Sequence, residues 1–298
     1  MNETYERVVF FNNCNNGDMH FSRQFVKYFA SKFTLPCFVS HFRCPSLLRD
    51  TLPYIRENTE SLLALPLTIH NNTLYVNTWI GNNKHKWYIL GKGCSLKGNY
   101  KMYEEYGNSL GISLPEEHEF IPEIDYSKYQ IGNVNPQNPK SIFFSNGSCL
   151  SRQGKNYDAD ELIIHLARKY KDCDFYVTQK INTDVKNVID ANSLFDTGGH
   201  SNLNELSYLS TFCKIIVGRS SGPYSFAHTK ENLLDSSKTF VVTSNSEREG
   251  HWALMNEYQI PNKAKQKWIE CHVDKNTDCV HELKRVLEEE IDEKFGNR

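Results

Sequence analysis

The chain has 298 residues, of which 39% are hydrophobic and 23% are charged, a balance typical of a soluble globular protein with one large or two ordinary domains. The formal net charge of −2 provides no global positive field for nucleic acid, and no apolar run approaches the roughly 20 residues that span a membrane. Nine cysteines without C-x-x-C spacing favour reduced thiols in a cytoplasmic compartment.

The first part of the chain alternates expected strands and helices. Arg7–Phe11 predicts a buried strand, and the helical spacing of Phe21, Phe25 and Phe29 predicts a helix over residues 19–33. The further elements expected here are a strand at 35–42, a helix opened by Pro45 and Ser46, apolar runs at 61–69 and 73–79 divided by a turn, and a helix at 100–110. Residues 115–140 are rich in proline, asparagine and charge, and therefore predict a connector.

The alternation then restarts. The expected strands are 141–145, 174–178, 214–217 and 238–243, and the expected helices are 158–170, with Asp158 as its N-cap, 203–211 and 279–295. This order predicts two parallel-sheet α/β layers joined by a linker. The expected boundaries are an N-terminal α/β domain at 1–125, a linker at 126–140, a C-terminal α/β domain at 141–274 and a terminal helix at 275–298. We expect that helix to cross back to the first domain.

Three unusual loops follow expected strands, at the carboxyl ends where parallel sheets bind ligands. In the first, 12–18, Asp18 is either a helix cap or a general base for an incoming hydroxyl. The second, 145–155, carries Arg152 and Lys155 among small residues, which suits a diphosphate as well as an ordinary solvated loop. The third, 218–223, is either a plain strand-to-helix turn or an anion site built on glycine.

Two Asp-x-Asp triplets, 158–160 and 172–174, raise the question of a metal that grips a diphosphate. The first heads an expected helix, where carboxylates favour the helix dipole, and the second precedes a strand. Structural roles are therefore favoured for both, and no metal is expected.

Taken together, the loops resemble the two-domain GT-B glycosyltransferases, and most nearly the ADP-heptose transferase (lipopolysaccharide heptosyltransferase) family. Asn16-Gly17-Asp18 occupies the place of the family's Gly-Asp pair, and Lys155 that of its phosphate-binding lysine. Residues 192–206 match its D-x-x-G…L-x-E-L segment, and residues 220–225 match its Asp-[Ser/Thr]-Gly-Pro-x-His loop. In that loop the family's aspartate is Ser220 here and its histidine is Ser225, so the resemblance does not fix ADP-heptose as the donor.

The resemblance implies two Rossmann-like α/β domains facing across a cleft, and a metal-independent glycosyltransferase without a cofactor. Its substrates would be a nucleotide-sugar donor and a glycan, lipid-linked glycan or other hydroxyl acceptor, in cytoplasmic synthesis of cell-surface polysaccharide or glycoconjugate, with peripheral membrane association and no nucleic acid. Asp18 would be the catalytic base. The expected donor-binding residues are Asn16, Gly17, Ser148, Arg152, Lys155, Arg219, Ser220, Ser221, Gly222 and Tyr224. The alternatives are a non-catalytic nucleotide- or sugar-binding protein on the same scaffold and a nucleotide-sugar epimerase.

Overall fold

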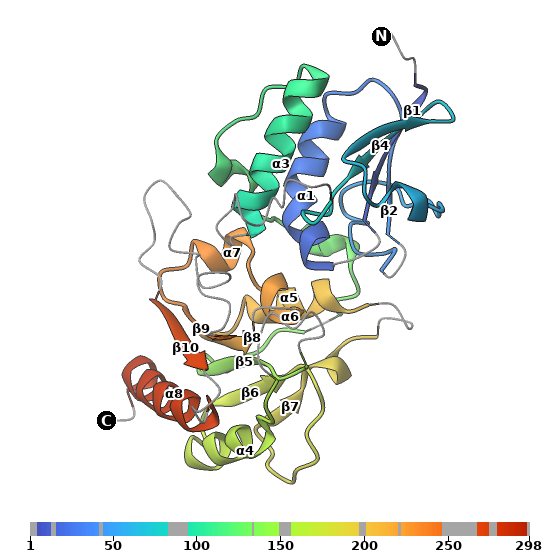
Figure 1. Ribbon diagram of the computed structural model, residues 1–298. Coiled ribbons are helices and arrows are strands. Elements are labelled where there is room, and N and C mark those ends of the chain that lie inside the picture. The colour runs from blue at the N-terminus through green and yellow to red at the C-terminus, as the bar shows by residue number, and fades with distance from the viewer. Residues whose placement is uncertain are drawn as a thin grey trace. The chain divides into compact units, whose positions relative to one another are not determined.

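The computed structural model (Figure 1) describes residues 5–12, 16–41, 44–82, 95–132, 134–148, 156–196, 201–219, 222–245, 267–273 and 279–296. The described chain divides into two compact units, of which one ends at Lys128 and the other begins at Tyr129. This division lies inside the segment expected to be a linker. Among the described helices, none combines the length and the hydropathy that a membrane span requires.

The first unit contains a four-stranded sheet in the order β2-β1-β4-β3. Its strands are β1 (Arg7–Phe11), β2 (Cys37–Ser40), β3 (Leu67–His70) and β4 (Thr73–Asn77). β1 is parallel to β2 and to β4, whereas β3 forms an antiparallel hairpin with β4. The hairpin turn consists of Asn71 and Asn72, with φ of 47° and 54°, a left-handed conformation that asparagine tolerates well.

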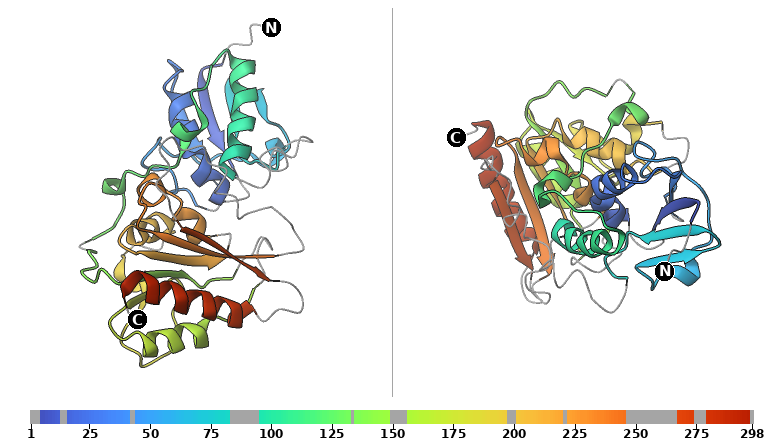
Figure 2. Two further views of the ribbon diagram at one scale, coloured as in Figure 1. Left: turned by 90° about the vertical axis from the view of Figure 1, so that its left-hand side faces the viewer. Right: turned by 90° about the horizontal axis from the view of Figure 1, so that it is seen from above.

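Two helices, α1 (Asn16–Ala30) and α3 (Ser95–Leu110), lie side by side in this unit (Figures 1 and 2). The ring of Phe25 stacks on Tyr103 and on Phe120, with centroid separations of 4.6 and 4.0 Å. Phe120 ends the short 3-10 helix η2 (Glu117–Phe120), and two further 3-10 helices are η1 (Glu60–Leu62) and η3 (Tyr126–Lys128). The aromatic spacing that predicted α1 therefore reflects its buried face.

The helix expected at Pro45 is wrong, because residues 45–51 form successive turns. In an α-helix the carbonyl of Leu47 would accept a hydrogen bond from the Thr51 N–H. Instead it accepts one from the Arg23 guanidinium at 2.9 Å, and the Thr51 N–H donates to Leu48 at 2.8 Å. The bonds from Leu47, Arg49 and Thr51 all go to the carbonyl three residues earlier, as in turns, and only that from Leu52 to Leu48, among the described ones, spans four residues.

The second unit contains a six-stranded sheet in the order β10-β9-β8-β5-β6-β7, and every neighbouring pair is parallel. The strands are β5 (Ser141–Ser145), β6 (Asp174–Val177), β7 (Val188–Asp190), β8 (Ile215–Arg219), β9 (Thr239–Asn245) and β10 (Lys267–Val273). Counted from β5, this is the doubly wound order 3-2-1-4-5-6 of the Rossmann fold. The two edge strands, β7 and β10, were missed from the sequence.

Helices cover both faces of this sheet. One face carries α4 (Asp160–Lys169) and α8 (Cys279–Phe295), which lie on the same side of the sheet in Figures 1 and 2. The other helical elements of the unit are η4 (Ala191–Leu194), α5 (Leu203–Ser210), α6 (Pro223–Phe226) and α7 (Lys230–Leu233). The rings of Tyr224 on α6 and Phe240 on β9 pack edge to face at 6.4 Å.

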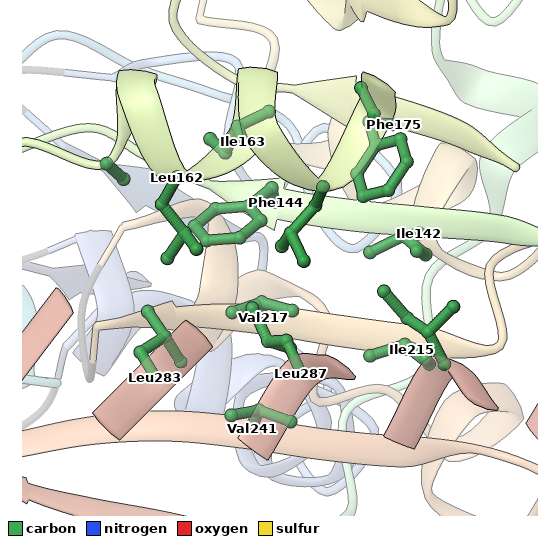
Figure 3. Packing of buried hydrophobic residues seen from close by; sticks show 14 of the residues in the cluster. Ile142, Phe144, Leu162, Ile163, Phe175, Ile215, Val217, Val241, Leu283 and Leu287 are labelled. Carbon is green, nitrogen blue, oxygen red and sulfur yellow. The ribbon is translucent and has the colours of Figure 1, made fainter. Parts of the chain in front are cut away.

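Figure 3 shows the core beneath α4 and α8. Leu283 and Leu287 of α8 pack with Val217 and Val241 of the central strands, and Leu162 of α4 joins the same cluster. The expectation that the terminal helix crosses back to the first domain is therefore wrong. Its apolar stripe completes the core of the second unit, where Leu283 and Leu287 are at most 1% exposed.

Candidate functional site

The second sheet has a topological switch point between β5 and β8. These strands are neighbours, with Ser145 paired to Gly218 at their carboxyl ends. β5 is followed by α4, which packs on one face of the sheet. β8 is followed by α6, whose Tyr224 packs against Phe240 of β9. In open α/β sheets ligands bind beyond the strand ends at such a point. Two of the three loops singled out in the sequence start here.

Gly218 permits the close packing of this edge. A Cβ atom at this position would lie 2.9 Å from the Cβ of Ser145 and 2.8 Å from that of Tyr224. Both of these atoms are Cβ atoms of buried residues, so neither can move aside as the end of a flexible side chain could. The glycine therefore lets β8, β5 and α6 meet at the switch point.

Gly222 has a different reason to be glycine. Its φ of 56° and ψ of −135° lie in a region that only glycine occupies readily. No described atom lies within 4 Å of the position that a Cβ would take. The backbone conformation alone therefore favours glycine here, at the residue before Pro223, which opens α6.

Arg219, the last residue of β8, is buried and only 2% exposed. Its Nη1 donates hydrogen bonds to the carbonyls of Asn146, at 3.0 Å, and Gly147, and its Nη2 donates to the carbonyl of Tyr157. The guanidinium also lies 4.2 Å from the centroid of the Tyr157 ring. Its described hydrogen bonds therefore go to main-chain carbonyls of the loop between β5 and α4.

The side chain of Asn146 links the ends of β5 and β6. Its Nδ2 donates to the Gln179 carbonyl at 2.9 Å, and its Oδ1 accepts the Gln179 N–H at 2.8 Å. Farther along the same edge, Asn192 Nδ2 donates to the carbonyl of Thr178 at 2.7 Å. These amide links were missed from the sequence, where the only signal was an asparagine directly after a strand.

In the first unit, Asp18 is the third residue of α1 and is 7% exposed. A carboxylate in the first turn of a helix is stabilised by the helix dipole, so the location suits a capping role as well as a base. Ser22 ties this helix to α3, because its Oγ donates a hydrogen bond to Asn99 Oδ1 at 3.0 Å. The carbonyl of Thr78, just after β4, is an alternative acceptor 3.4 Å from the same Oγ. A fully buried ion pair between Arg23 and Asp50 fixes the helix further.

The expected site residues fall into two groups and a remainder. Asn16 and Gly17 lie with the buried Asp18 in the first turn of α1, and both Asn16 and Gly17 are partly exposed. On the second unit, Ser148 is exposed after β5, and Tyr224 is 1% exposed, with its ring against Phe240 and His228. The expected residues that lie outside the described ranges are Arg152, Lys155, Ser220 and Ser221.

Both Asp-x-Asp triplets have structural roles, as the sequence indicated. α4 begins at Asp160 with Ala159 as its N-cap, so the expected cap at Asp158 is one residue too early. Asp158 Oδ1 still accepts the Asp160 N–H at 2.9 Å, and Asp172 pairs with Lys140 at 2.6 Å. Within the described ranges no group of three or more His, Cys, Asp or Glu side chains has an arrangement that could hold a metal ion.

No protein-family model and no curated protein sequence matches this chain. Among solved structures, E. coli heptosyltransferase WaaC with ADP has a TM-score of 0.50 and 11% identity, covering 95% of this chain and 97% of that chain. The two chains share a fold. The two-unit α/β fold class that the sequence suggested, that of the GT-B glycosyltransferases, is thereby confirmed.

Two further solved structures give slightly lower scores. The glycosyl transferase family 9 structure from Veillonella parvula DSM 2008 is 13% identical, with a TM-score of 0.48, and covers 97% of this chain and 90% of that chain. E. coli heptosyltransferase WaaC with ADP-2-deoxy-2-fluoro heptose is 12% identical, with a TM-score of 0.47, and covers 95% and 99% of the respective chains.

Proposed function

We propose that this protein is a glycosyltransferase that moves a sugar from a nucleotide-sugar donor to a hydroxyl acceptor. The observation that carries the proposal is the fold shared with E. coli heptosyltransferase WaaC, seen there with ADP, over nearly the whole length of both chains. The switch point at β5 and β8 supports it, because this is where a doubly wound sheet binds a nucleotide.

In the proposed reaction the acceptor hydroxyl attacks the anomeric carbon of the donor sugar, and the bond from that carbon to the diphosphate oxygen breaks. Asp18 takes the proton of the hydroxyl. The departing diphosphate gains negative charge, which Arg152, Lys155 and the backbone N–H groups of 220–222 stabilise in place of a metal. The proposed acceptor is a glycan or lipid-linked glycan of cell-surface polysaccharide synthesis, reached from the cytoplasm with peripheral membrane association.

The first test is a thermal-shift screen against ADP, UDP, GDP and CMP and their sugars, because a ligand that binds only the native state raises its apparent stability. The best donor is then used in a transfer assay. Asp18→Asn should reduce turnover by about two to four orders of magnitude, while the donor affinity stays unchanged. Glu105→Gln, at an exposed position of α3, is the matched control and should have no effect.

The outcomes separate the alternatives. Donor binding without transfer or donor hydrolysis indicates a non-catalytic binding protein, which the serines at 220 and 225 would suit. Interconversion of the donor sugar without an acceptor indicates an epimerase. Near wild-type transfer by Asp18→Asn leaves Asp18 as a helix cap. Transfer should also continue in excess EDTA, and abolition by the chelator with rescue by Mg²⁺ or Mn²⁺ would refute metal independence.

A further inference from the structure

The segment at the carboxyl end of β4, residues 77–82, buries its polar side chains and exposes its aromatic one. Asn77, Thr78 and Asn82 are all 0% exposed. Trp79, between them, is partly exposed. Core packing would bury the indole first, because it has the largest apolar surface of the segment. The exposure of Trp79 therefore has another reason than the stability of the core.

Two asparagine side chains hold the main chain of Trp79. Its N–H donates a hydrogen bond to Asn77 Oδ1 at 3.0 Å, and its carbonyl accepts one from Asn82 Nδ2 at 2.6 Å. Asn77 Nδ2 donates in turn to the Leu63 carbonyl at 2.9 Å, and Asn82 Nδ2 lies 2.9 Å from the hydroxyl of Tyr106 on α3. These buried bonds fix residue 79 in advance, and pre-organisation of this kind lowers the entropic cost of binding a ligand.

Gly81 provides a seat for the indole. A Cβ atom at this position would lie 2.4 Å from both Cε2 and Cζ2 of Trp79, and 2.8 Å from its Nε1. Packed atoms do not approach so closely, so any side chain at residue 81 would push the ring away. The glycine lets the indole rest against the main chain.

Thr78 connects this segment to the first turn of α1. β1 and β4 are neighbouring parallel strands, and the Thr78 N–H donates to the carbonyl of Phe11, the last residue of β1, at 2.9 Å. Thr78 Oγ1 lies 2.8 Å from Sδ of Met19. Asp18 precedes Met19 and Trp79 follows Thr78, so both flank this contact at the carboxyl edge of the first sheet.

We propose that Trp79 is an acceptor-binding residue, whose indole stacks on the apolar face of a pyranose ring. In pyranoses such as glucose and galactose, C–H groups gather on a face of the ring and hydroxyl groups around its rim. An indole has an apolar body and a polar N–H, and therefore suits such a partner. The acceptor is a carbohydrate by this assignment, rather than a simple alcohol or a lipid hydroxyl.

The assignment to the acceptor rests on the proposed function, in which Asp18 deprotonates the acceptor hydroxyl. A sugar held at Trp79 lies beside the turn that carries this carboxylate. The platform itself rests on the seat at Gly81, the held main chain and the exposure of the indole. The nucleotide is assigned to the switch point of the second sheet, so a nucleobase is not expected at Trp79.

The first arm of the experiment measures sugar binding directly and needs neither donor nor turnover. The chain has four tryptophans, so labelling with 5-fluorotryptophan gives four ¹⁹F resonances, and Trp79→Phe identifies one of them by its loss. Methyl β-D-glucopyranoside and methyl β-D-galactopyranoside are the probes. The Trp79 resonance should shift with at least one of them, with a Kd of about 1–10 mM, as expected for a small ligand with few contacts. Glycerol, which has hydroxyls but no ring face, and adenosine should leave it unchanged.

The second arm is the transfer assay with the best donor and each glycoside as acceptor. Trp79→Leu should raise the acceptor KM by about 5- to 50-fold, because the aromatic face is lost, and the donor KM by less than about 2-fold. Gly81→Ala should have the same effect, because the far end of the indole must turn away from the new methyl group. Tyr5→Leu is the matched control and should behave as wild type. Tyr5 is also a partly exposed aromatic residue, but it precedes β1, at the opposite edge of the same sheet.

Three results would overturn the proposal. A Trp79 resonance that neither glycoside shifts would show that the indole is no sugar platform, whether or not these glycosides are acceptors. A shift with adenosine alone would make residue 79 a nucleobase site. Trp79→Leu with a lower Tm but unchanged sugar affinity would make the residue structural only.

Failure of this proposal and failure of the proposed function give different results. If a glycoside shifts the Trp79 resonance while wild type binds no nucleotide sugar, the proposed function fails and the sugar platform stands. If transfer proceeds with an unchanged acceptor KM in both Trp79→Leu and Gly81→Ala, the platform fails and the proposed function stands.

Discussion

Replacing Gly218 with alanine adds one methyl group at the point where β8, β5 and α6 meet. The new Cβ would lie 2.8 Å from the Cβ of Tyr224 and 2.9 Å from that of Ser145, about 0.6 Å short of ordinary contact at the closer one. Neither neighbour can rotate away, because a Cβ moves only with its backbone. β8 must therefore separate from β5 or from α6.

Overpacking of this kind costs about 1–3 kcal/mol of unfolding free energy. For a unit of this size that corresponds to a fall in Tm of about 2–12 °C. Because Gly218 pairs with both Ser145 and Val242, the shift also displaces the strand ends from which the site loops start. We therefore expect weaker donor binding together with the lower Tm.

The assay is urea and thermal unfolding followed by circular dichroism, with donor titration of the folded protein. Gly17→Ala is the matched control for stability, because a Cβ there meets no described atom within 4 Å and the residue is helical. Alanine at that position should leave stability unchanged or raise it by up to about 1 kcal/mol. If Gly218→Ala is as stable as wild type, the close approach at the switch point does not constrain this residue and the reasoning is refuted.

Two further predictions concern the second unit. Burial lowers the pKa of His228 from 6.5 to about 3. Between these two pH values the imidazole is therefore protonated in the unfolded state and neutral in the folded state. Stability should therefore fall between pH 6.5 and 3 by about 1.4 kcal/mol per pH unit from this group, and His228→Gln should remove that part of the slope in urea titrations; an unchanged slope would contradict the prediction. Leu287→Ala should lower the unfolding free energy of this unit by about 2–5 kcal/mol, because the side chain is 1% exposed in its core. Arg285→Ala, on the exposed side of α8, should change it by less than about 0.5 kcal/mol, and equal effects of the two substitutions would disprove the packing of this helix.

Several parts of the fold and of the candidate site were predictable from the sequence. Residues 8–11 and 142–144 are continuous apolar runs, and each makes up most of a strand in a largely parallel sheet. The alternation of such runs with helical periods predicted two α/β layers, and chain direction alone placed the loops after these strands at the carboxyl edges. The edge strands β7 and β10 escaped notice because β7 has only three residues, and because adjacent apolar residues, Trp268 and Ile269, interrupt the alternation in β10.

The sequence by itself determined the local periodicities, the order of the elements and the glycine and cation content of the loops. Only the tertiary structure decided which groups these loops contact. Arg219 reads as a ligand-binding cation in sequence, yet its carbonyl partners lie 62 to 73 residues away along the chain. Likewise, Arg23 donates to the Leu47 carbonyl 24 residues away, in the segment where Pro45 suggested a helix. A buried polar group must find a partner, and which one it finds depends on which distant segments the sheets bring together, a property that no local pattern encodes.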